Sequence, residues 1–332
     1  MLSKFVEKFP QCRVLIIGDL IADEFVYGEI ARVSREAPVM ILRYERTETM
    51  PGGAGNAAAN VAALAKQASI IGVVGRDLPG RQLTLSLRNR GVNTKTIITS
   101  SKYQTPTKTR ILAGSVHSTR QQVIRVDREP TRGLPEHLIN QLIETLTSSL
   151  DQIDAIIVSD YNYGVVTLTL LNALRKILSE PNKRQIPIIV DSRFHLTNCS
   201  NFTAATPNQA ELEAIAGKRL DKEKELLTVG KKLCQDLGLK VLLLTRGSEG
   251  MIVFQPSCEP YILPAIGSKD PVDVTGAGDT VIAVFTLALA SGASFYQAAE
   301  IANHAGGIVV MKRGTSTLTQ SELLASIDAN PS

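Results

Sequence analysis

Residues 155–160 (AIIVSD) and 186–191 (IPIIVD) share one form, a short apolar run that ends in an aspartate. Helical composition precedes the first run up to about Ser148, separates the two runs up to Leu178, and returns over Gln209–Ala216. Strands that alternate with helices predict a parallel sheet joined by right-handed crossovers. This part of the chain therefore predicts an α/β fold.

Apolar runs elsewhere in the chain end in polar residues as well. Val14–Ile17 is followed by Gly18-Asp19, with Asp23 four residues further on, and Val241–Leu244 is followed by Thr245-Arg246. In open α/β sheets the carboxyl ends of the strands meet at one edge, and ligands bind there. Helix capping places the same residue types at such positions. The strand ends alone therefore leave both a ligand site and a set of caps open.

Two segments interrupt the alternation of strands and helices. Residues 25–43 consist of short half-apolar pieces around Gly28 and Pro38, and residues 107–113 and 121–127 alternate between apolar and polar side chains. A period of two is typical of strands. We expect these segments to form a small accessory sheet that could cover a site.

The composition excludes several functional classes. Of 332 residues, 44% are hydrophobic and 20% charged, and the net charge of +4 is spread without a Lys/Arg run. This distribution argues against nucleic acid as a partner and remains compatible with a small anionic substrate. Scattered cysteines and histidines argue against a zinc site and a disulfide framework. Without a signal-like N-terminus or an apolar run of about 18 residues, we expect a cytoplasmic protein with no membrane partner.

Residues 273–280 (DVTGAGDT) precede the apolar run Val281–Ala290, which is predicted to be a helix. Glycines let an anion approach the main chain, and the first amides of a helix have no partners within it. A carboxylate beside an anion site needs another task, and Asp279 could accept a proton from an attacking hydroxyl. Alternatively, Asp279 is a helix N-cap and the glycines form a tight turn. The stretch alone does not separate the two hypotheses.

Two further motifs precede predicted helices. Residues 51–56 (PGGAGN) form a glycine turn before a helix over 57–66, where a second ligand contact is plausible. In residues 206–211 (TPNQAE), Asn208 and Glu211 share one helix face and could orient water around a magnesium ion. An N-cap followed by a capping glutamate explains the same spacing and is the favoured interpretation of this motif by itself. The absence of GxxxxGK[ST] and GxGxxG argues against a P-loop and a nicotinamide site.

Together these pieces resemble the ribokinase-like (PfkB) family of carbohydrate kinases over nearly the whole chain. Residues 52–56 resemble its N-terminal glycine signature and residues 273–280 its C-terminal signature. The resemblance implies a three-layer α/β sandwich with a central, mostly parallel sheet. It also implies a single domain over residues 1–332, with β-lid segments at about 25–43 and 107–127.

The resemblance also implies an activity and a set of site residues. The activity is ATP-dependent phosphorylation of a sugar, with Asp279 as the base and the amides of Gly276, Ala277 and Gly278 holding the transferred group. The implied sugar contacts are Asp19, Asp23, Gly52, Gly53, Asn56, Lys108, Arg125 and Asp127. The implied ATP contacts are Asn208, Thr245, Arg246, Gly247 and Asn303. Asn208 and Glu211 would hold Mg²⁺ through water, and the family leaves room for a monovalent cation such as K⁺.

Several motifs narrow the likeness to kinases that phosphorylate O1 of D-glycero-β-D-manno-heptose 7-phosphate in bacterial ADP-heptose synthesis. These motifs include residues 34–39 (SREAPV), 122–127 (QVIRVD) and 159–161 (SDY). Two positions depart from those kinases, since Tyr163 replaces a lysine and Ser192-Arg193 replaces Pro-Lys. Arginine binds two phosphate oxygens where lysine offers a point charge. The departures therefore bear on which sugar phosphate is held.

Other expectations follow from the same resemblance. A kinase for another sugar or sugar phosphate is the main alternative, and a non-catalytic sugar or nucleotide sensor is a minor one. The exposed edges of a β lid predict a homodimer joined through the lid. The sequence ends soon after the kinase-like region, so we expect a separate protein to supply the nucleotidyltransferase step.

Overall fold

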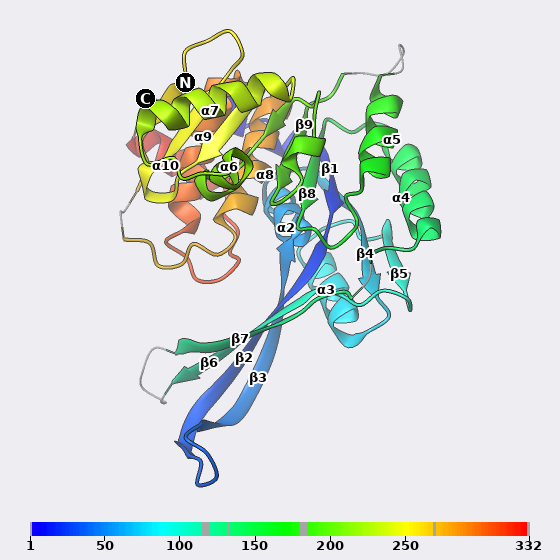
Figure 1. The fold of residues 1–332 in the computed structure, drawn as a ribbon, viewed down its shortest axis with the longest axis vertical. Coiled ribbons are helices and arrows are strands. Elements are labelled where there is room, and N and C mark those ends of the chain that lie inside the picture. The colour runs from blue at the N-terminus through cyan, green and yellow to red at the C-terminus, as the bar shows by residue number, and fades with distance from the viewer. Residues whose placement is uncertain (1, 115–119, 132, 180–184, 268–269, 331–332) are drawn as a thin grey trace.

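The computed structural model describes residues 2–114, 120–131, 133–179, 185–267 and 270–330. Figure 1 shows a body in which helices cover a central sheet, and a long, narrow second sheet that projects from this body. Among the described residues, no helix has the length and apolar character needed to cross a membrane.

The central sheet has nine strands in the order β13-β12-β11-β10-β9-β8-β1-β4-β5. Neighbouring strands pair in parallel from β5 to β11, and β12 and β13 add an antiparallel edge. The predicted parallel sheet is therefore confirmed. The strands are β1 Arg13–Gly18, β4 Gln67–Gly75, β5 Ile97–Ser100, β8 Ala155–Asp160, β9 Ile188–Ser192, β10 Ala204–Ala205, β11 Val241–Thr245, β12 Met251–Phe254 and β13 Tyr261–Leu263.

Successive side chains of the buried strands enter two different cores, one on each face of the sheet. In β1, Val14 and Ile16 belong to the first core, and Leu15 and Ile17 to the second. Fully burying such a side chain stabilises the fold by about 1.5–3 kcal/mol, so both faces need a layer of helices. The first core includes α1 Ser3–Val6, α2 Ala54–Leu64, α3 Leu78–Asn89, α8 Ala277–Ala290, α9 Phe295–Val309 and α10 Gln320–Ala329. The second includes α4 Glu136–Ser149, α5 Leu168–Leu178, α6 Gln209–Ala216 and α7 Glu223–Asp236.

The projecting sheet has four strands in the order β3-β2-β6-β7. Its strands are β2 Leu20–Val33, β3 Met40–Gly53, β6 Thr107–Gly114 and β7 Gln121–Arg128. The predicted pairing of the last two strands is confirmed as antiparallel, while residues 115–119 of the predicted lid segment lie outside the described residues. The first lid segment is longer than predicted, because the ladder between β2 and β3 extends back to Leu20 and Gly53.

Helix α8 begins earlier than predicted. It starts at Ala277, with Gly276 as its N-cap at φ 77°, so Asp279 lies within the first turn. Glycine tolerates this left-handed backbone without steric cost, which allows the turn to enter the helix four residues before the apolar run. The hypothesis that Asp279 is the N-cap is therefore wrong.

Candidate active site

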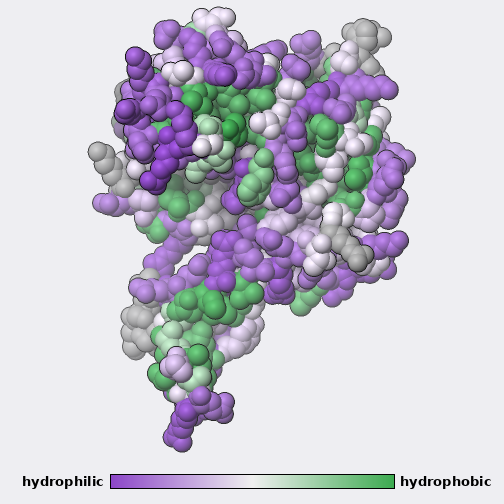
Figure 2. All heavy atoms as spheres, viewed as in Figure 1, coloured by the Kyte–Doolittle hydropathy of each residue, from purple (hydrophilic) through white to green (hydrophobic). Residues whose placement is uncertain are grey.

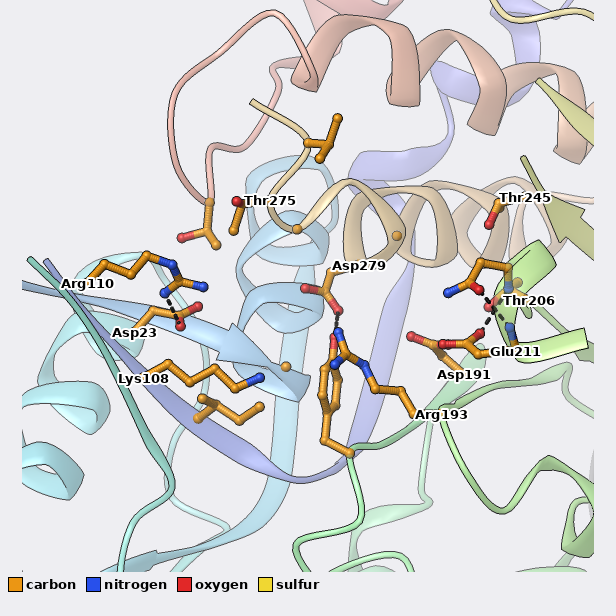
Figure 3. Close-up of a pocket in the computed structure, with 18 residues that line it drawn as sticks. Asp23, Lys108, Arg110, Asp191, Arg193, Thr206, Glu211, Thr245, Thr275 and Asp279 are labelled. Carbon is orange, nitrogen blue, oxygen red and sulfur yellow. Dashed lines mark hydrogen bonds and ion pairs between the residues drawn. The ribbon is translucent and has the colours of Figure 1, made fainter. Parts of the chain in front are cut away.

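A polar cavity of about 270 Å³ lies between the carboxyl ends of the central strands and the base of the projecting sheet (Figure 3). Its walls come from both sheets and from the N-termini of α6 and α8. The lining residues are Ile21, Asp23, Gly53, Lys108, Arg110, Tyr161, Asp191, Arg193, Thr206, Asn208, Glu211, Thr245, Val274, Thr275, Gly276, Gly278, Asp279 and Thr315.

A second cavity, of about 400 Å³, adjoins the first and has a mainly apolar lining. The two cavities share Asn208, Thr245, Val274 and Gly278. Apolar side chains that line the second cavity include Met251, Ile266, Val281 and Val310. The pair therefore offers an apolar compartment, suited to a planar ring, next to a polar compartment suited to charged groups.

Asp279 is only 5% exposed, and each of its carboxylate oxygens accepts a hydrogen bond. Asn56 Nδ2 donates to Oδ2 at 2.8 Å, and the Tyr161 hydroxyl donates to Oδ1 at 3.0 Å. Burial raises the pKa of Asp279 to about 6, although both hydrogen bonds and nearby Arg193 oppose the shift. A carboxylate with that pKa is ionised at neutral pH and basic enough to accept a proton.

Asp273 fixes the glycine turn before Asp279 through two hydrogen bonds. Its carboxylate accepts from the Thr275 amide and the Gly314 amide, both at 2.9 Å. Gly276 and Gly278 line the polar cavity. The amide of Ala277 donates to the Val274 carbonyl at 3.3 Å, and Ala277 lines the apolar cavity. The turn thus presents main chain to both cavities.

Asp19 does not reach the cavity, contrary to the sequence-based expectation of a sugar contact. It is 0% exposed, and it accepts hydrogen bonds from the amides of Tyr161, Tyr163 and Val165 at 2.8, 3.1 and 3.0 Å. Burial raises its pKa to about 6. Because its oxygens accept these amides, Asp19 holds the turn after β8 and contributes to the site only through that turn.

Asp23 does line the cavity, and Arg110 neutralises its charge through a contact of 2.6 Å. Gly52 lies behind it, since a Cβ there would approach Asp23 Oδ2 to 2.5 Å. Gly53, at φ 56°, lines the cavity itself. The glycines therefore leave space for the Asp23 carboxylate and for a ligand.

Two cations lie near the ring of Tyr161. The ammonium of Lys108 is 5.5 Å and the guanidinium of Arg193 is 4.6 Å from the ring centroid. Lys108 is only 8% exposed, and burial followed by repulsion from Arg193 lowers its pKa. Arg125 and Asp127 pair with each other at 2.7 and 2.5 Å on exposed β7. Lys108 lines the cavity, whereas Asp127, its partner in the β6–β7 ladder, and Arg125 are near Lys108 without lining the cavity.

At the opposite end of the cavity, Asn208 and Glu211 form a capping box at the start of α6. Asn208 Oδ1 accepts from the Glu211 amide and Glu211 Oε2 accepts from the Asn208 amide, both at 2.9 Å. The capping interpretation is therefore confirmed. Burial raises the pKa of Glu211, and that of nearby Asp191 even more, the latter also through repulsion from Glu211 and Asp279. Arg193 opposes both shifts, and a bound cation would further stabilise the ionised forms of the two acids.

The donors at this end suit Mg²⁺ held through water. Within the described part of the chain, no group of three His, Cys, Asp or Glu residues could bind a metal directly. Magnesium needs few protein ligands, because it keeps several waters and takes phosphate oxygens. The carboxylate of Glu211 and the amide of Asn208 fit that role.

The expected nucleotide contacts separate into two groups. Thr245, Gly247 and Asn303 line the apolar cavity. The Asn303 side chain donates to the Pro264 carbonyl at 2.8 Å. Arg246 lines neither cavity, because it pairs with Glu249 and donates to Gln209.

Several cavity residues were not assigned from the sequence. They are Arg110, Tyr161, Asp191, Thr206, Thr275 and Thr315, while Arg193 was singled out only as a departure from the heptose-kinase pattern. The sequence could have predicted two of them as site residues. Asp191 ends an apolar run, and Tyr161 follows the strand-end Asp160. Arg110 is two residues from Lys108 on the same strand, and the two therefore face the same side. Thr315 lies in a loop and had no such signal.

A helix-flanked parallel sheet, with a buried carboxylate at a polar cavity that adjoins an apolar one, has the parts that a small-molecule kinase requires. Residues 14–322 match the family model described as pfkB family carbohydrate kinase. The chain belongs to this family and is an ATP-dependent sugar kinase, which uses a sugar, ATP and a divalent metal ion. The sensor hypothesis is therefore set aside.

Curated relatives and solved structures agree with this assignment. The Bifunctional protein HldE of Desulfatibacillum aliphaticivorans is 37% identical over 327 residues, which cover 98% of this chain and 65% of that protein. HldE of Haemophilus influenzae strain PittEE is 36% identical over 99% of this chain and 66% of its own length. The chain thus spans about two thirds of the length of these relatives.

Structural similarity extends to more distant proteins of the same fold. Arabidopsis thaliana ribokinase, complexed with ribose and ATP, has a TM-score of 0.71 at 18% identity, covering 96% of this chain and 99% of its own. Escherichia coli phosphofructokinase-2, in complex with potassium, has a TM-score of 0.77 at 19% identity with the same coverage. The predicted ribokinase-like fold is confirmed.

Proposed function

We propose that this kinase transfers the γ-phosphoryl group of ATP to O1 of D-glycero-β-D-manno-heptose 7-phosphate. The observation that carries the proposal is Asp279, a buried carboxylate that faces a polar cavity at the glycine-capped start of α8. The choice of sugar is supported by the heptose-kinase motifs and by 36–37% identity to HldE proteins over nearly the whole chain.

The acceptor would lie at the end of the cavity that adjoins the projecting sheet. Asp23, already neutralised by Arg110, offers carboxylate oxygens to sugar hydroxyls. Burial and then repulsion from Arg193 lower the pKa of Lys108, although Asp23 and Asp127 oppose the shift, so an anionic substituent of the sugar near the two cations would relieve their mutual repulsion. A phosphorylated sugar suits this charge better than a neutral one.

In the reaction, Asp279 would take the proton from the attacking hydroxyl. The main chain at Gly276 and Gly278 would stabilise the transferred phosphoryl group, and the Ala277 amide would join once it releases the Val274 carbonyl. Magnesium would neutralise phosphate charge, with Asn208 and Glu211 orienting its waters. Covering of the cavity by the four-stranded sheet would exclude water, whose attack would waste ATP.

The nucleotide would occupy the apolar cavity. Its base would pack among the apolar side chains, and its phosphates would point toward Gly278, which both cavities share. Thr245 and Gly247 would contact the nucleotide. Asn303 would contribute near the base, and the use of a monovalent cation such as K⁺ remains an expectation from the family resemblance.

A kinase for another sugar or sugar phosphate is the alternative, and one experiment separates the two. The purified enzyme is supplied with ATP, Mg²⁺ and a panel of sugars and sugar phosphates, and each product is mapped by ¹H–³¹P NMR. We expect the highest kcat/KM for heptose 7-phosphate, with the new phosphate at O1. A higher kcat/KM for another sugar, or phosphorylation at another hydroxyl, would replace the heptose assignment.

We also propose that two copies pair through the four-stranded sheet. Every residue of β7 is exposed. Seven apolar side chains of the sheet are 42–65% exposed, namely Ile30, Val33, Met40, Tyr44, Val123, Ile124 and Val126. Figure 2 shows the projecting part of the molecule with a green, hydrophobic surface over this sheet. Such patches are rare on monomers. Light scattering at micromolar concentration should give the mass of a dimer, whereas a monomeric mass would contradict the proposal.

A further inference from the structure

Tyr161 connects two buried acids. It follows β8 directly, and its main-chain amide donates to Asp19 Oδ2 at 2.8 Å while its hydroxyl donates to Asp279 Oδ1 at 3.0 Å. Asp279 is 118 residues away in sequence. The Tyr161 side chain therefore joins the turn after β8 to the start of α8.

The turn that carries Tyr161 is fixed on both sides. Asp19 accepts two further amides of this turn, as described above. Asp160 accepts from the Asn162 amide at 2.9 Å and from the Ser192 hydroxyl at 2.7 Å. Asn162 has a left-handed backbone with φ 66°. These contacts fix the backbone of the turn, and the hydrogen bond to Asp279 places the Tyr161 hydroxyl.

The second oxygen of Asp279 is held by a chain of side-chain hydrogen bonds. Asn56, its donor, receives a contact of 3.3 Å from Asn60 Nδ2 at its own Oδ1, and Asn60 Oδ1 accepts from the Thr280 hydroxyl at 3.0 Å. The chain of hydrogen bonds leaves the Asn56 Nδ2 group directed at Asp279. A donor on each oxygen fixes the plane of the carboxylate.

We infer that Tyr161 is a positioning residue that acts through Asp279, orienting its carboxylate and favouring the charged form by hydrogen-bond donation. The inference rests on the proposed role of Asp279 as the base. It concerns the hydroxyl alone, since the aromatic ring also contacts Lys108 and Arg193.

The sign of the effect follows from the surroundings of Asp279. Burial and the negative charge of Asp23 favour the neutral acid, whereas Asn56, Tyr161 and Arg193 favour the carboxylate. Burial raises the pKa of Tyr161 itself, so its hydroxyl remains a donor at neutral pH. The base must be ionised to work, so kcat/KM should fall as the pH drops through about 6. Loss of the hydroxyl should raise the pKa of Asp279 and move this fall to higher pH.

Asp191 also faces Asp279, and its charge acts in the same direction as that of Asp23. These charged neighbours are unchanged when only the Tyr161 hydroxyl is removed. A shift of the pH profile in that variant would therefore report the hydrogen bond and not a change in the surrounding charges.

The test compares Tyr161→Phe with Tyr163→Phe on the best sugar substrate. Tyr163 lies in the same turn, but its hydroxyl bonds to Glu129 at 3.0 Å and not to Asp279. The pH dependence of kcat/KM is measured from pH 5 to 9, with a thermal melt of each variant. We expect the acidic midpoint of Tyr161→Phe to rise by about 0.5–1 unit, and that of Tyr163→Phe to stay at the wild-type value. A purely structural role would lower the rate at every pH without moving the midpoint.

A second measurement keeps the test decisive if Tyr161→Phe does not fold. Fluorotyrosine placed at position 161 preserves shape and donates more strongly, so the acidic midpoint should move to lower pH. An unchanged midpoint in a folded variant would overturn the inference and leave the proposed function intact. A wild-type enzyme that phosphorylates sugar with no acidic fall above pH 5 would overturn both this inference and the assignment of Asp279 as the base.

Discussion

Helices α6 and α8 each carry an acidic residue at the third helical position, and they use it in opposite ways. In α6 the N-cap Asn208 and Glu211 satisfy each other's main-chain amides. In α8 the N-cap is Gly276, which has no side chain, and Asp279 turns to Asn56 and Tyr161. The third helical position therefore stabilises α6, whereas in α8 it carries the proposed base.

The difference has a physical cause. A side-chain cap occupies amides at the start of the helix, which stabilises the helix by about 1 kcal/mol and closes the end to other ligands. A glycine cap gives up this stabilisation and leaves main chain accessible to an anion. Both helix ends line the polar cavity. The start of α6 is fixed by its cap, and the start of α8 carries the proposed base. Substitutions at equivalent positions of the two ends test this contrast.

The largest effect on activity is expected at the start of α8. Asp279→Asn removes the proposed base and should lower kcat by about 10²–10⁴-fold, with little change in the KM for sugar. The melting temperature should not fall, because a neutral amide is less costly to bury than the Asp279 carboxylate. Steady-state kinetics and a thermal melt check both parts. Turnover near the wild-type rate would remove Asp279 from its proposed role.

The two glycines of the α8 turn should differ from each other. A Cβ on Gly276 would lie 2.4 Å from Asn56 Nδ2 at a backbone φ of 77°, whereas a Cβ on Gly278 would meet nothing within 4 Å. Gly276→Ala should therefore lower both stability and activity. Gly278→Ala should keep the melting temperature and lose about tenfold to a hundredfold in kcat/KM, because its methyl group would enter the space proposed for the phosphoryl group. Equal melting temperatures of the two variants would contradict this distinction.

A smaller effect is expected at Glu211. Glu211→Gln retains an oxygen for the Asn208 amide, so the cap and the melting temperature should be preserved. The lost charge should raise the Mg²⁺ concentration needed for half-maximal activity by about tenfold. Magnesium titrations at fixed ATP measure this requirement. An unchanged requirement would mean that Glu211 serves only as a cap.

The smallest effect concerns stability. Asn208→Ala removes the cap of α6 and should cost about 1 kcal/mol. Ser294→Ala is the matched control, since Ser294 forms a capping box with Gln297 at the start of α9 and lines neither cavity. Denaturant unfolding should show similar losses in both variants, while only Asn208→Ala should raise the KM for ATP. Equal kinetics in the two variants would leave Asn208 with a capping role alone.

Local sequence predicted most elements correctly, because periodicity and helix signals depend on neighbouring residues. It failed where a long-range contact overrides them. The start of α8 moved into the glycine turn because Gly276 adopts a left-handed backbone beside Asn56. The two-residue strand β10 has no periodic signal and exists because β9 and β11 pair with it on either side.

For the site residues too, the sequence supplied the residue types, and long-range contacts decided which of them line the cavity. Asp19 and Asp23 look equivalent in sequence, since both follow the first strand closely. The turn after β8 encloses Asp19, whereas Arg110 meets Asp23 at the cavity. Arg125 and Asp127 belong to a recognisable motif, yet they pair with each other on an exposed strand. A motif places residues along the chain but does not determine which way each side chain faces.

The sequence by itself determined the α/β alternation, the two glycine turns and the membership of a sugar kinase family, because these depend on local composition and spacing. Only the tertiary structure decided how Asp279, the proposed base, is held. Asn56 lies 223 residues and Tyr161 118 residues from Asp279. Such contacts arise from strand order and from the packing of α2 against α8, which no local period encodes. Burial among these distant segments also gives Asp279 the raised pKa that suits a base.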